Sequence, residues 1–114
     1  MSDALSFEVL HSSPRSQGRV GRVTTPHGTF ETPAFMTVGT KGTVKGLYPS
    51  LLRGCGCEVL LGNTYHLLLR PGPDVVRDLG GLHAVMGWQG PILTDSGGYQ
   101  AYSMADTNAV DEDG

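Results

Sequence analysis

The sequence predicts an α/β protein in which a small antiparallel meander precedes a parallel sheet. Two observations support this prediction. After residue 33, three apolar runs alternate with helix-like segments, which is typical of parallel strands joined by right-handed crossovers. Before residue 33, short strand-like segments are joined by hairpin-sized connections. The chain has 114 residues, of which 39% are hydrophobic and 17% charged, so we expect one domain with a modest core.

The opening segment, residues 1–32, is expected to form the meander. Strand-like patterns cover residues 6–10, 21–24 and 29–32. A loop rich in serine at residues 12–18 separates the first two, and the turn Pro26-His27-Gly28 separates the last two. Connections of this length join neighbouring antiparallel strands.

The next segment, residues 33–105, is expected to form the first strand–helix units of the parallel sheet. The predicted strands are residues 34–38, 58–62 and 92–94. These runs are almost wholly apolar, which indicates strands buried on both faces. The predicted helices are residues 48–53 and 73–79, with a further helical turn at 82–88. The first two have a proline near the start and a glycine after the end, as helices commonly do.

The carboxyl ends of these strands are the predicted site. Parallel strands end on one edge of their sheet, so residues 38–39, residues 61–63 and Asp95-Ser96 should converge. After Asp95 and Ser96, Gly97 and Gly98 would let backbone N–H groups approach a ligand closely. Tyr99 adds a flat face, and Gln100 adds a paired donor and acceptor. This combination suits a planar, hydrogen-bonding ligand such as a nucleobase.

A simpler interpretation of the same stretch stays open. Gly-Gly is a common turn signal, and an aspartate after a strand often caps the segment that follows. Under this interpretation Asp95 is a structural residue. The predicted convergence of three strand ends favours the functional interpretation.

Charge and cysteine content set broad limits on the class of protein. The formal net charge is −3, but residues 106–114 hold four acidic residues and no basic one. Most basic residues lie in the first half, a weak bias that fits either a polyanionic partner or a solvated surface. No run is apolar enough to span a membrane and no secretory signal is evident, so a cytoplasmic protein is expected.

The two cysteines, Cys55 and Cys57, are expected to be free thiols. Two residues apart on one strand they would form a strained disulfide, which is the less favoured alternative. They also lack a second half for a metal site, because the histidines are scattered at positions 11, 27, 66 and 83. No metal site is therefore predicted within the chain.

Several motifs in unbroken order resemble the tRNA-guanine transglycosylases, also called queuine tRNA-ribosyltransferases. The matching stretches are residues 27–29, 31–36, 39–40, 61–67, 69–72, 80–83 and 95–100. The last of these is Asp-Ser-Gly-Gly-Tyr-Gln, and the similarity extends from about residue 6 to the last residue. One departure is Thr37, where the family usually has proline.

The resemblance implies a TIM-barrel enzyme that exchanges guanine in the tRNA anticodon for queuine or its 7-deazaguanine precursor. By that resemblance Asp95 is the general acid/base on the leaving and entering bases. The base pocket is lined by Asp95, Ser96, Gly97, Gly98 and Tyr99, with Gln100 and Asn63 close by. The implied partners are tRNA, guanine and the 7-deazaguanine bases, with a homodimer or a family heterodimer as the assembly.

Length is the main departure from the family pattern, because a TIM barrel takes about 250 residues. The family's nucleophilic aspartate and its zinc ligands have no counterpart in these 114 residues. The sequence is therefore expected to be the N-terminal fragment of one barrel domain, inactive alone and without a cofactor of its own. Residues 106–114 resemble the connection that leads onward in the family. The alternative is a non-catalytic relative that binds a base, tRNA or another subunit.

Overall fold

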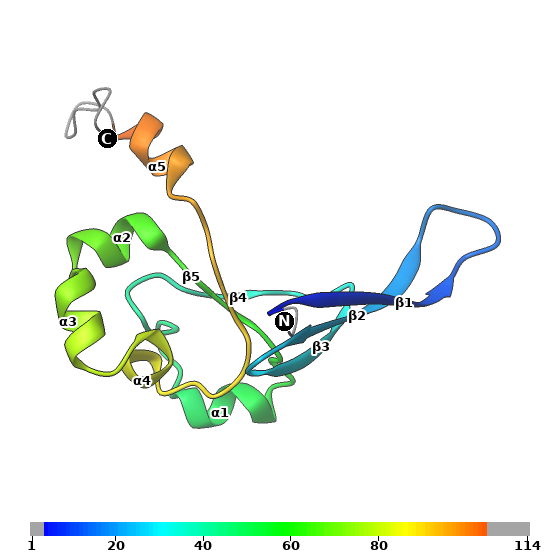
Figure 1. Ribbon diagram of the computed structural model, residues 1–114, viewed down its shortest axis with the longest axis horizontal. Coiled ribbons are helices and arrows are strands. Elements are labelled where there is room, and N and C mark those ends of the chain that lie inside the picture. The colour runs from blue at the N-terminus through cyan, green and yellow to red at the C-terminus, as the bar shows by residue number, and fades with distance from the viewer. Residues whose placement is uncertain (1–3, 105–114) are drawn as a thin grey trace.

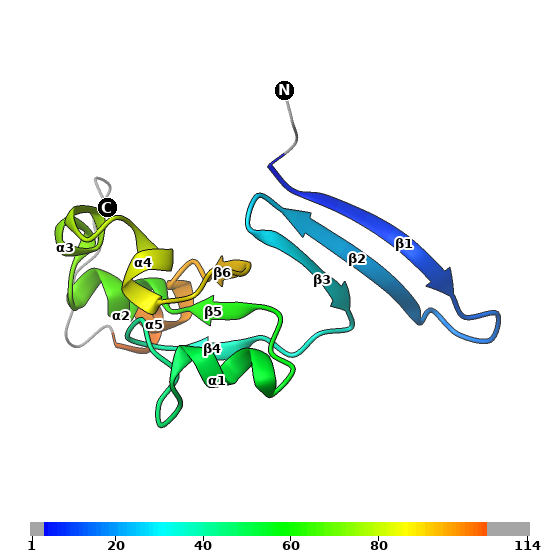
Figure 2. The same cartoon turned by 90° about the horizontal axis from the view of Figure 1, so that it is seen from below.

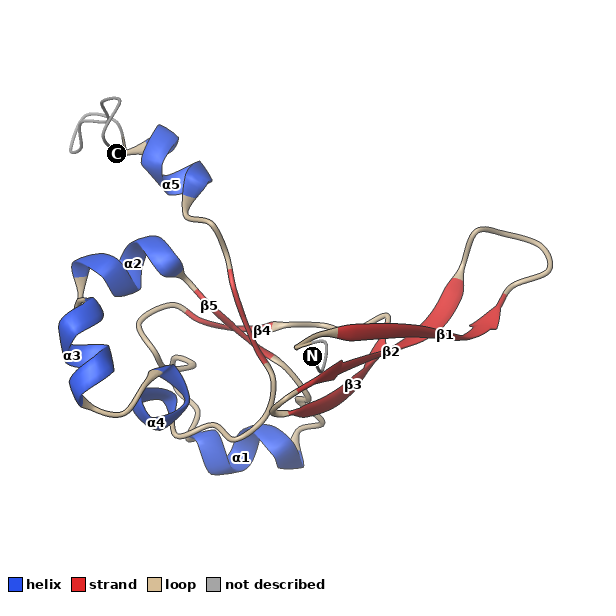
Figure 3. Cartoon of the chain, in the orientation of Figure 1, coloured by secondary structure: helices blue, strands red, loops and turns tan. Residues whose placement is uncertain are grey.

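The structure, a computed structural model, describes residues 4–104, which form two three-stranded sheets and five short helices (Figures 1 and 3). The strands are β1 Ser6–Ser12, β2 Arg19–Thr25, β3 Gly28–Thr32, β4 Thr37–Gly39, β5 Leu60–Gly62 and β6 Ile92–Thr94. The helices are α1 Pro49–Gly54, α2 Thr64–Leu69, α3 Pro73–Asp78, α4 Leu82–Met86 and α5 Gly98–Ser103. None of the helices between residues 4 and 104 is long and apolar enough to cross a membrane.

The predicted antiparallel meander is confirmed as the sheet β1-β2-β3. A tight turn joins β2 and β3, where the Thr25 hydroxyl donates to the Gly28 carbonyl at 3.0 Å and accepts from the His27 N–H at 3.1 Å. Gly28 has φ 119°, a conformation that favours glycine. Arg22 and Glu31 face each other across the two strands as an ion pair at 3.2 Å.

The parallel sheet has the order β4-β5-β6 and carries the predicted convergence of strand ends. Gly39, Gly62 and Thr94 lie in one register row, so all three strands end at the same edge. Helix α1 connects β4 to β5, and α2, α3 and α4 lie between β5 and β6 in the chain. Figure 2 shows the meander beyond the opposite edge, where the parallel strands begin.

The sheet has one covered face, so the prediction of strands buried on both faces is wrong. Leu60 packs in a core cluster with Leu52 of α1, Met86 of α4 and the fully buried Trp88. On the other face, Val38 is 48% exposed and Leu93 41% exposed. An apolar run shows that a strand lacks polar side chains, but it does not show whether another part of the protein packs on the strand's second face.

The predicted strand at residues 34–38 is also misplaced. The strand begins at Thr37, and Phe35 lies before it with 84% of its surface exposed. Pro33 has no N–H to donate to a ladder, which disfavours strand pairing where the apolar run begins. The other two parallel strands occur where predicted, although β5 is confined to the last three of its five predicted residues.

Three helices were predicted and two were missed. Helices α1, α3 and α4 confirm the predictions to within two residues at each end. Helix α2 follows β5 directly, and its start is marked by Asn63, whose side chain accepts from the His66 N–H at 3.0 Å. Helix α5 follows Gly97, which has φ 71°. The segment predicted as an acidic connection, residues 106–114, lies outside the described residues.

The meander is docked against the parallel unit by contacts near the start of the parallel strands. The His27 ring stacks on the His83 ring of α4 with centroids 3.6 Å apart, and His83 Nε2 lies 3.0 Å from the Gly90 carbonyl. The Glu31 N–H points at the Glu58 carboxylate at 3.5 Å. These contacts leave the opposite edge of the parallel sheet clear of the meander.

Candidate functional site

Asp95 is the first residue after β6 and is held on the backbone of its neighbour strand. Its N–H lies 3.4 Å from the Gly62 carbonyl, so the ladder between β5 and β6 continues one step past the strand. The side chain is half-buried. Asp95 thus projects from the edge where the three parallel strands end, as the sequence predicted.

The Asp95 carboxylate is bound by the residues that begin α2. Oδ1 accepts from the Thr64 N–H at 2.9 Å, and Oδ2 accepts from the Asn63 amide nitrogen at 3.3 Å. The Thr64 hydroxyl donates to the Asp95 backbone carbonyl as well. Three donors from two consecutive residues therefore fix both the backbone and the side chain of Asp95.

Asn63 is the residue that joins this carboxylate to the fold. It is 8% exposed, and within residues 4–104 it is the one buried polar residue. Its amide oxygen caps α2 through His66, and its amide nitrogen binds Asp95. Because both ends of the amide are engaged, the side chain has one favourable orientation. The pairing of Asn63 and Asp95, which are 32 residues apart, confirms that the strand ends converge.

Gly97 has a packing role in the described structure, in addition to the ligand-facing role that its sequence context predicts. Its φ of 71° requires a residue that tolerates the left-handed region. A Cβ at this position would lie 3.3 Å from the Cβ of Tyr65 and 3.4 Å from its backbone nitrogen. The open side of Gly97 is therefore occupied by Tyr65. Within the described residues, this glycine permits close packing between the Asp95 loop and α2.

The remaining predicted site residues are more open. Ser96 is exposed, and its hydroxyl accepts from the Gly98 N–H at 3.3 Å. Tyr99 is 77% exposed on α5, and no aromatic ring between residues 4 and 104 stacks on it. Gln100 is half-buried on the same helix. Asp95, Asn63 and Gly97 thus form a fixed group, and Tyr99 presents a free ring beside it in the chain.

The sequence reasoning missed Thr64 and Tyr65 as parts of the site. Thr64 supplies two of the three donors that hold Asp95, and Tyr65 fills the space beside Gly97. The signal that could have found them was Asn63 as a helix cap directly after an apolar strand, because a cap exposes free N–H groups in the following turn.

Potential metal ligands do not gather in the described part of the chain. No group of three or more histidine, cysteine, aspartate or glutamate side chains between residues 4 and 104 has metal-binding spacing. Cys55 and Cys57 are free thiols, as predicted, and the Cys57 sulfur lies 3.4 Å from the Thr37 hydroxyl. Residues 4–104 therefore offer no ligand set for the zinc that the family resemblance implies.

Fold and site together define an α/β protein whose carboxylate, amide and hydroxyl groups meet at the carboxyl edge of a parallel sheet. The chain matches the family described as queuine tRNA-ribosyltransferase over residues 13–114. The chain belongs to this family.

Relatives carrying the name queuine tRNA-ribosyltransferase match almost the whole chain. A protein from Thermus thermophilus is 57% identical over 112 residues, covering 98% of this chain and 29% of the relative. A protein from Moorella thermoacetica is 53% identical over 111 residues, covering 97% and 30% respectively. One from Desulforudis audaxviator is 54% identical over 108 residues, covering 95% and 29%. The chain thus spans less than a third of the length of these relatives.

Proposed function

We propose that this chain supplies the N-terminal part of a tRNA-guanine transglycosylase and, within it, one wall of the pocket that holds the exchanged base. The enzyme would replace guanine in the tRNA anticodon with queuine or its 7-deazaguanine precursor. The observation that carries the proposal is the Asp95 carboxylate, held at the strand edge by Thr64 and Asn63 at 2.9 and 3.3 Å. Family membership supplies the reaction class.

The proposed architecture is the first part of a TIM barrel. Residues 1–32 would be the meander, residues 33–105 the first strand–helix units, and residues 106–114 the connection onward. The helices α1 and α4 cover one face of the parallel sheet, while Val38, Leu61 and Leu93 lie in one row on the other. In a closed barrel that second face is the packed interior, and the edges of β4 and β6 are paired.

Asp95 would act as general acid and base on the departing and entering bases. An ionised carboxylate has about four acceptor positions, and Thr64 and Asn63 use two of them. The positions left over are available to an N–H group of the base. Because Asp95 is fixed before substrate arrives, its reorientation would add little to the barrier.

The attacking carboxylate would come from elsewhere in the complete enzyme. Between residues 4 and 104, the other acidic side chains lie on the meander, on α3 or before β5, and none is next to Asp95 in the chain. Tyr99 would stack on the base, and Ser96, Gly97, Gly98 and Gln100 would complete its surroundings. Partners would be tRNA, the free bases and a second family subunit, in the cytoplasm where tRNA is modified.

A graft tests the proposal. The matching N-terminal residues of the Thermus thermophilus relative are replaced by this chain, which is 57% identical over 112 residues. We expect the purified graft to incorporate labelled guanine into tRNA, with a folded structure confirmed by circular dichroism. A graft that folds and binds tRNA but exchanges no guanine would contradict the proposal. The unmodified relative serves as the positive control.

A further inference from the structure

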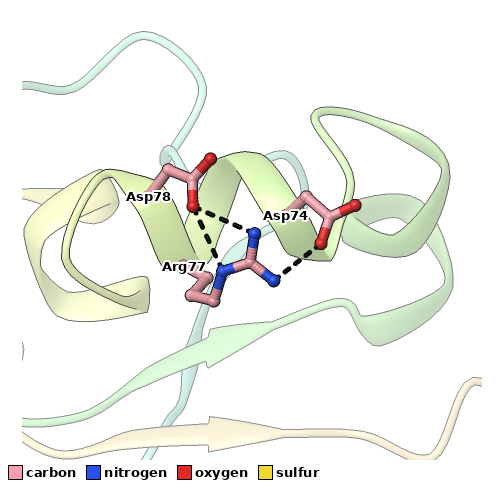
Figure 4. Close-up of polar contacts among 3 residues, drawn as sticks. All are labelled: Asp74, Arg77 and Asp78. Atoms are coloured by element: carbon pink, nitrogen blue, oxygen red, sulfur yellow. Dashed lines mark hydrogen bonds and ion pairs between the residues drawn. The ribbon is translucent and has the colours of Figure 1, made fainter.

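Two groups of polar side chains on or after the helices have no role in the proposed function. On α3, Arg77 binds Asp74 at 2.9 Å and Asp78 at 3.0 Å, so these charges satisfy one another (Figure 4). Directly after α1, Cys55 is an exposed free thiol, and Cys57 is a half-buried one. A free thiol can form a covalent bond, whereas a satisfied ion pair cannot. The cysteine pair therefore keeps a reactivity that the proposed function leaves unused.

The two cysteines lie in the turn that ends α1, and not on a strand. The Gly56 N–H donates to the Arg53 carbonyl at 3.0 Å. The Cys57 N–H donates to the Leu52 carbonyl, also at 3.0 Å, and together these are the hydrogen bonds of a Schellman turn. Gly56 has φ 81° and is the left-handed residue that this turn requires. Cys55 and Cys57 are therefore the residues on either side of it.

The turn removes the distance objection that applies to two cysteines on one strand. Along a strand, Cα atoms two residues apart are separated by about 6.6 Å, near the upper limit for a disulfide. Around a residue of helical conformation, left-handed or right-handed, the same two atoms are about 5.4 Å apart. This separation is close to the commonest value in disulfides. The turn around Gly56 thus brings the backbones of Cys55 and Cys57 within bridging range.

The Cys57 side chain faces the fold, and its thiol hydrogen links the end of α1 to both neighbouring strands. Cys57 packs against the core cluster that contains Trp88. Its sulfur lies 3.4 Å from the Thr37 hydroxyl oxygen, at the start of β4, and 3.4 Å from the Val59 carbonyl oxygen, directly before β5. A disulfide has no S–H, so oxidation of Cys57 removes the donor for both acceptors.

Cys55 is the thiol that a reagent in solution reaches first. It is exposed, whereas Cys57 is half-buried. Both residues border one hollow of about 340 Å³, which gives a small oxidant room beside them. Attack by Cys55 on the oxidant therefore comes first, and attack by Cys57 on the modified Cys55 comes second.

We propose that Cys55 and Cys57 form a reversible thiol–disulfide switch that exchanges with low-molecular-weight disulfides such as oxidised glutathione. The Cys55 thiolate attacks one sulfur of the reagent, forms a mixed disulfide and releases one glutathione. The Cys57 thiolate then attacks the Cys55 sulfur, releases the second glutathione and closes the Cys55–Cys57 bond. The two protein thiols lose two electrons and two protons, and oxidised glutathione takes them up as two molecules of glutathione.

The proposed disulfide closes a ring with a single residue between its cysteines, so the bond is strained and readily reduced. Strained disulfides of this kind are labile and regulatory. Closing the bond draws the Cys57 sulfur toward the exposed Cys55 and away from the core cluster. The packing at the end of α1 should therefore differ between the reduced and the oxidised protein.

Equilibration of this chain in glutathione buffers tests the proposal. Thiols are trapped by acid and alkylated, and the tryptic peptide of residues 54–77, which holds both cysteines, is analysed by mass spectrometry. As oxidised glutathione increases, an unalkylated peptide about two mass units lighter than the dithiol should appear, because two hydrogens are lost. Dithiothreitol should restore the reduced peptide. In Cys57→Ser, a mixed disulfide with glutathione should accumulate on Cys55. In Cys55→Ser, the half-buried Cys57 should react at least about tenfold more slowly.

Tryptophan fluorescence gives a second readout that reports on the fold. Trp88 is the only tryptophan in the chain, and it belongs to the cluster that Cys57 packs against. Its emission should change when the wild-type chain is oxidised and return when the chain is reduced. The variant with both Cys55→Ser and Cys57→Ser is the matched control, and its emission should be the same in every glutathione buffer.

Three results would overturn the proposal. The first is a wild-type chain whose two thiols stay reduced in every buffer. The second is a mixed disulfide that persists on Cys55 of the wild type, because Cys57 would then not complete the exchange. The third is a disulfide between two chains, seen as a dimer on a non-reducing gel. Circular dichroism checks that each variant folds, and the reversible mass change of the wild type decides the question even if a serine variant does not fold.

Discussion

The meander and the parallel unit differ in how completely their strands are paired and covered. In the meander, β2 is paired on both sides and the connections are local. In the parallel unit, one face is covered by helices and the other is open, and the strands end together at Asp95 and Asn63. Within residues 4–104, the predicted site residues all lie in the parallel unit, which brings distant residues together.

The two regions should differ most in how much an aromatic side chain contributes to the free energy of unfolding. Trp88 is 1% exposed, its indole N–H donates to the Pro91 carbonyl at 3.1 Å, and the Arg53 guanidinium lies 4.6 Å from its ring. Trp88→Ala should lower the free energy of unfolding by about 3–5 kcal/mol. Phe7 on β1 is 51% exposed, so Phe7→Ala should cost much less. Equal losses in urea unfolding would contradict this contrast.

Gly97 lies where the loop after β6 packs on α2, so a side chain there should lower the free energy of unfolding. Gly97→Ala places a methyl group at φ 71° and 3.3 Å from Tyr65 Cβ. The left-handed conformation alone should cost about 1–2 kcal/mol of stability, measured by urea unfolding. Gly54 in α1 offers a control, because a methyl group added there would meet no atom within 4 Å. Gly54→Ala should therefore be neutral or stabilising. A Gly97→Ala protein as stable as wild type would exclude the packing role.

Substitution of Asn63 should lower both stability and the rate of guanine exchange, because its side chain caps α2 and also binds the Asp95 carboxylate. Asn63→Ala removes the cap of α2 and should cost about 0.5–2 kcal/mol of stability. In the graft it should also lower the rate of guanine exchange, since Asp95 loses one of its two side-chain donors. Asn63→Ser, which restores a cap but not the hydrogen bond to Asp95, should recover stability without recovering rate. Full recovery of the rate would show that the Asn63–Asp95 hydrogen bond is dispensable.

The smallest expected effect belongs to the surface of α3. Arg77 binds Asp74 at 2.9 Å and Asp78 at 3.0 Å, but these side chains are 69–81% exposed. Arg77→Ala should therefore change the free energy of unfolding by less than about 1 kcal/mol, and less still at high salt. A loss comparable to that of Trp88→Ala would show that α3 contributes more than its exposure indicates.

The contrast between the local connections of the meander and the long-range contacts of the parallel unit explains which parts of the fold the sequence predicts well. The meander was predicted strand by strand, because its turns carry local signals such as Pro26 and Gly28. Helix α3 was predicted from Pro73 and the glycines after residue 79 for the same reason. Helix α2 was missed because its Thr-Tyr-His start, directly after β5, shows no break in the apolar pattern apart from Asn63.

Contacts between residues far apart in the sequence were predicted only where the strand connections require them. Parallel connections require the strand ends to share an edge, so the meeting of Asn63 and Asp95 was predictable. The donation from the Thr64 N–H and the packing of Tyr65 on Gly97 depend on where α2 begins, and no pattern within the site motif encodes that. Likewise the exposure of Val38 depends on what else packs on the sheet.

The most direct test of the central claim is the rate of guanine exchange in the graft carrying Asp95→Asn. The amide keeps the size and part of the hydrogen bonding of the carboxylate but cannot transfer the proton. We expect exchange to fall by at least about 10²–10⁴-fold. Asp74→Asn, at an exposed carboxylate on α3, should exchange like the parent graft. A folded Asp95→Asn graft that exchanges guanine as fast as its parent would show that Asp95 is structural and that the proton is moved by another group.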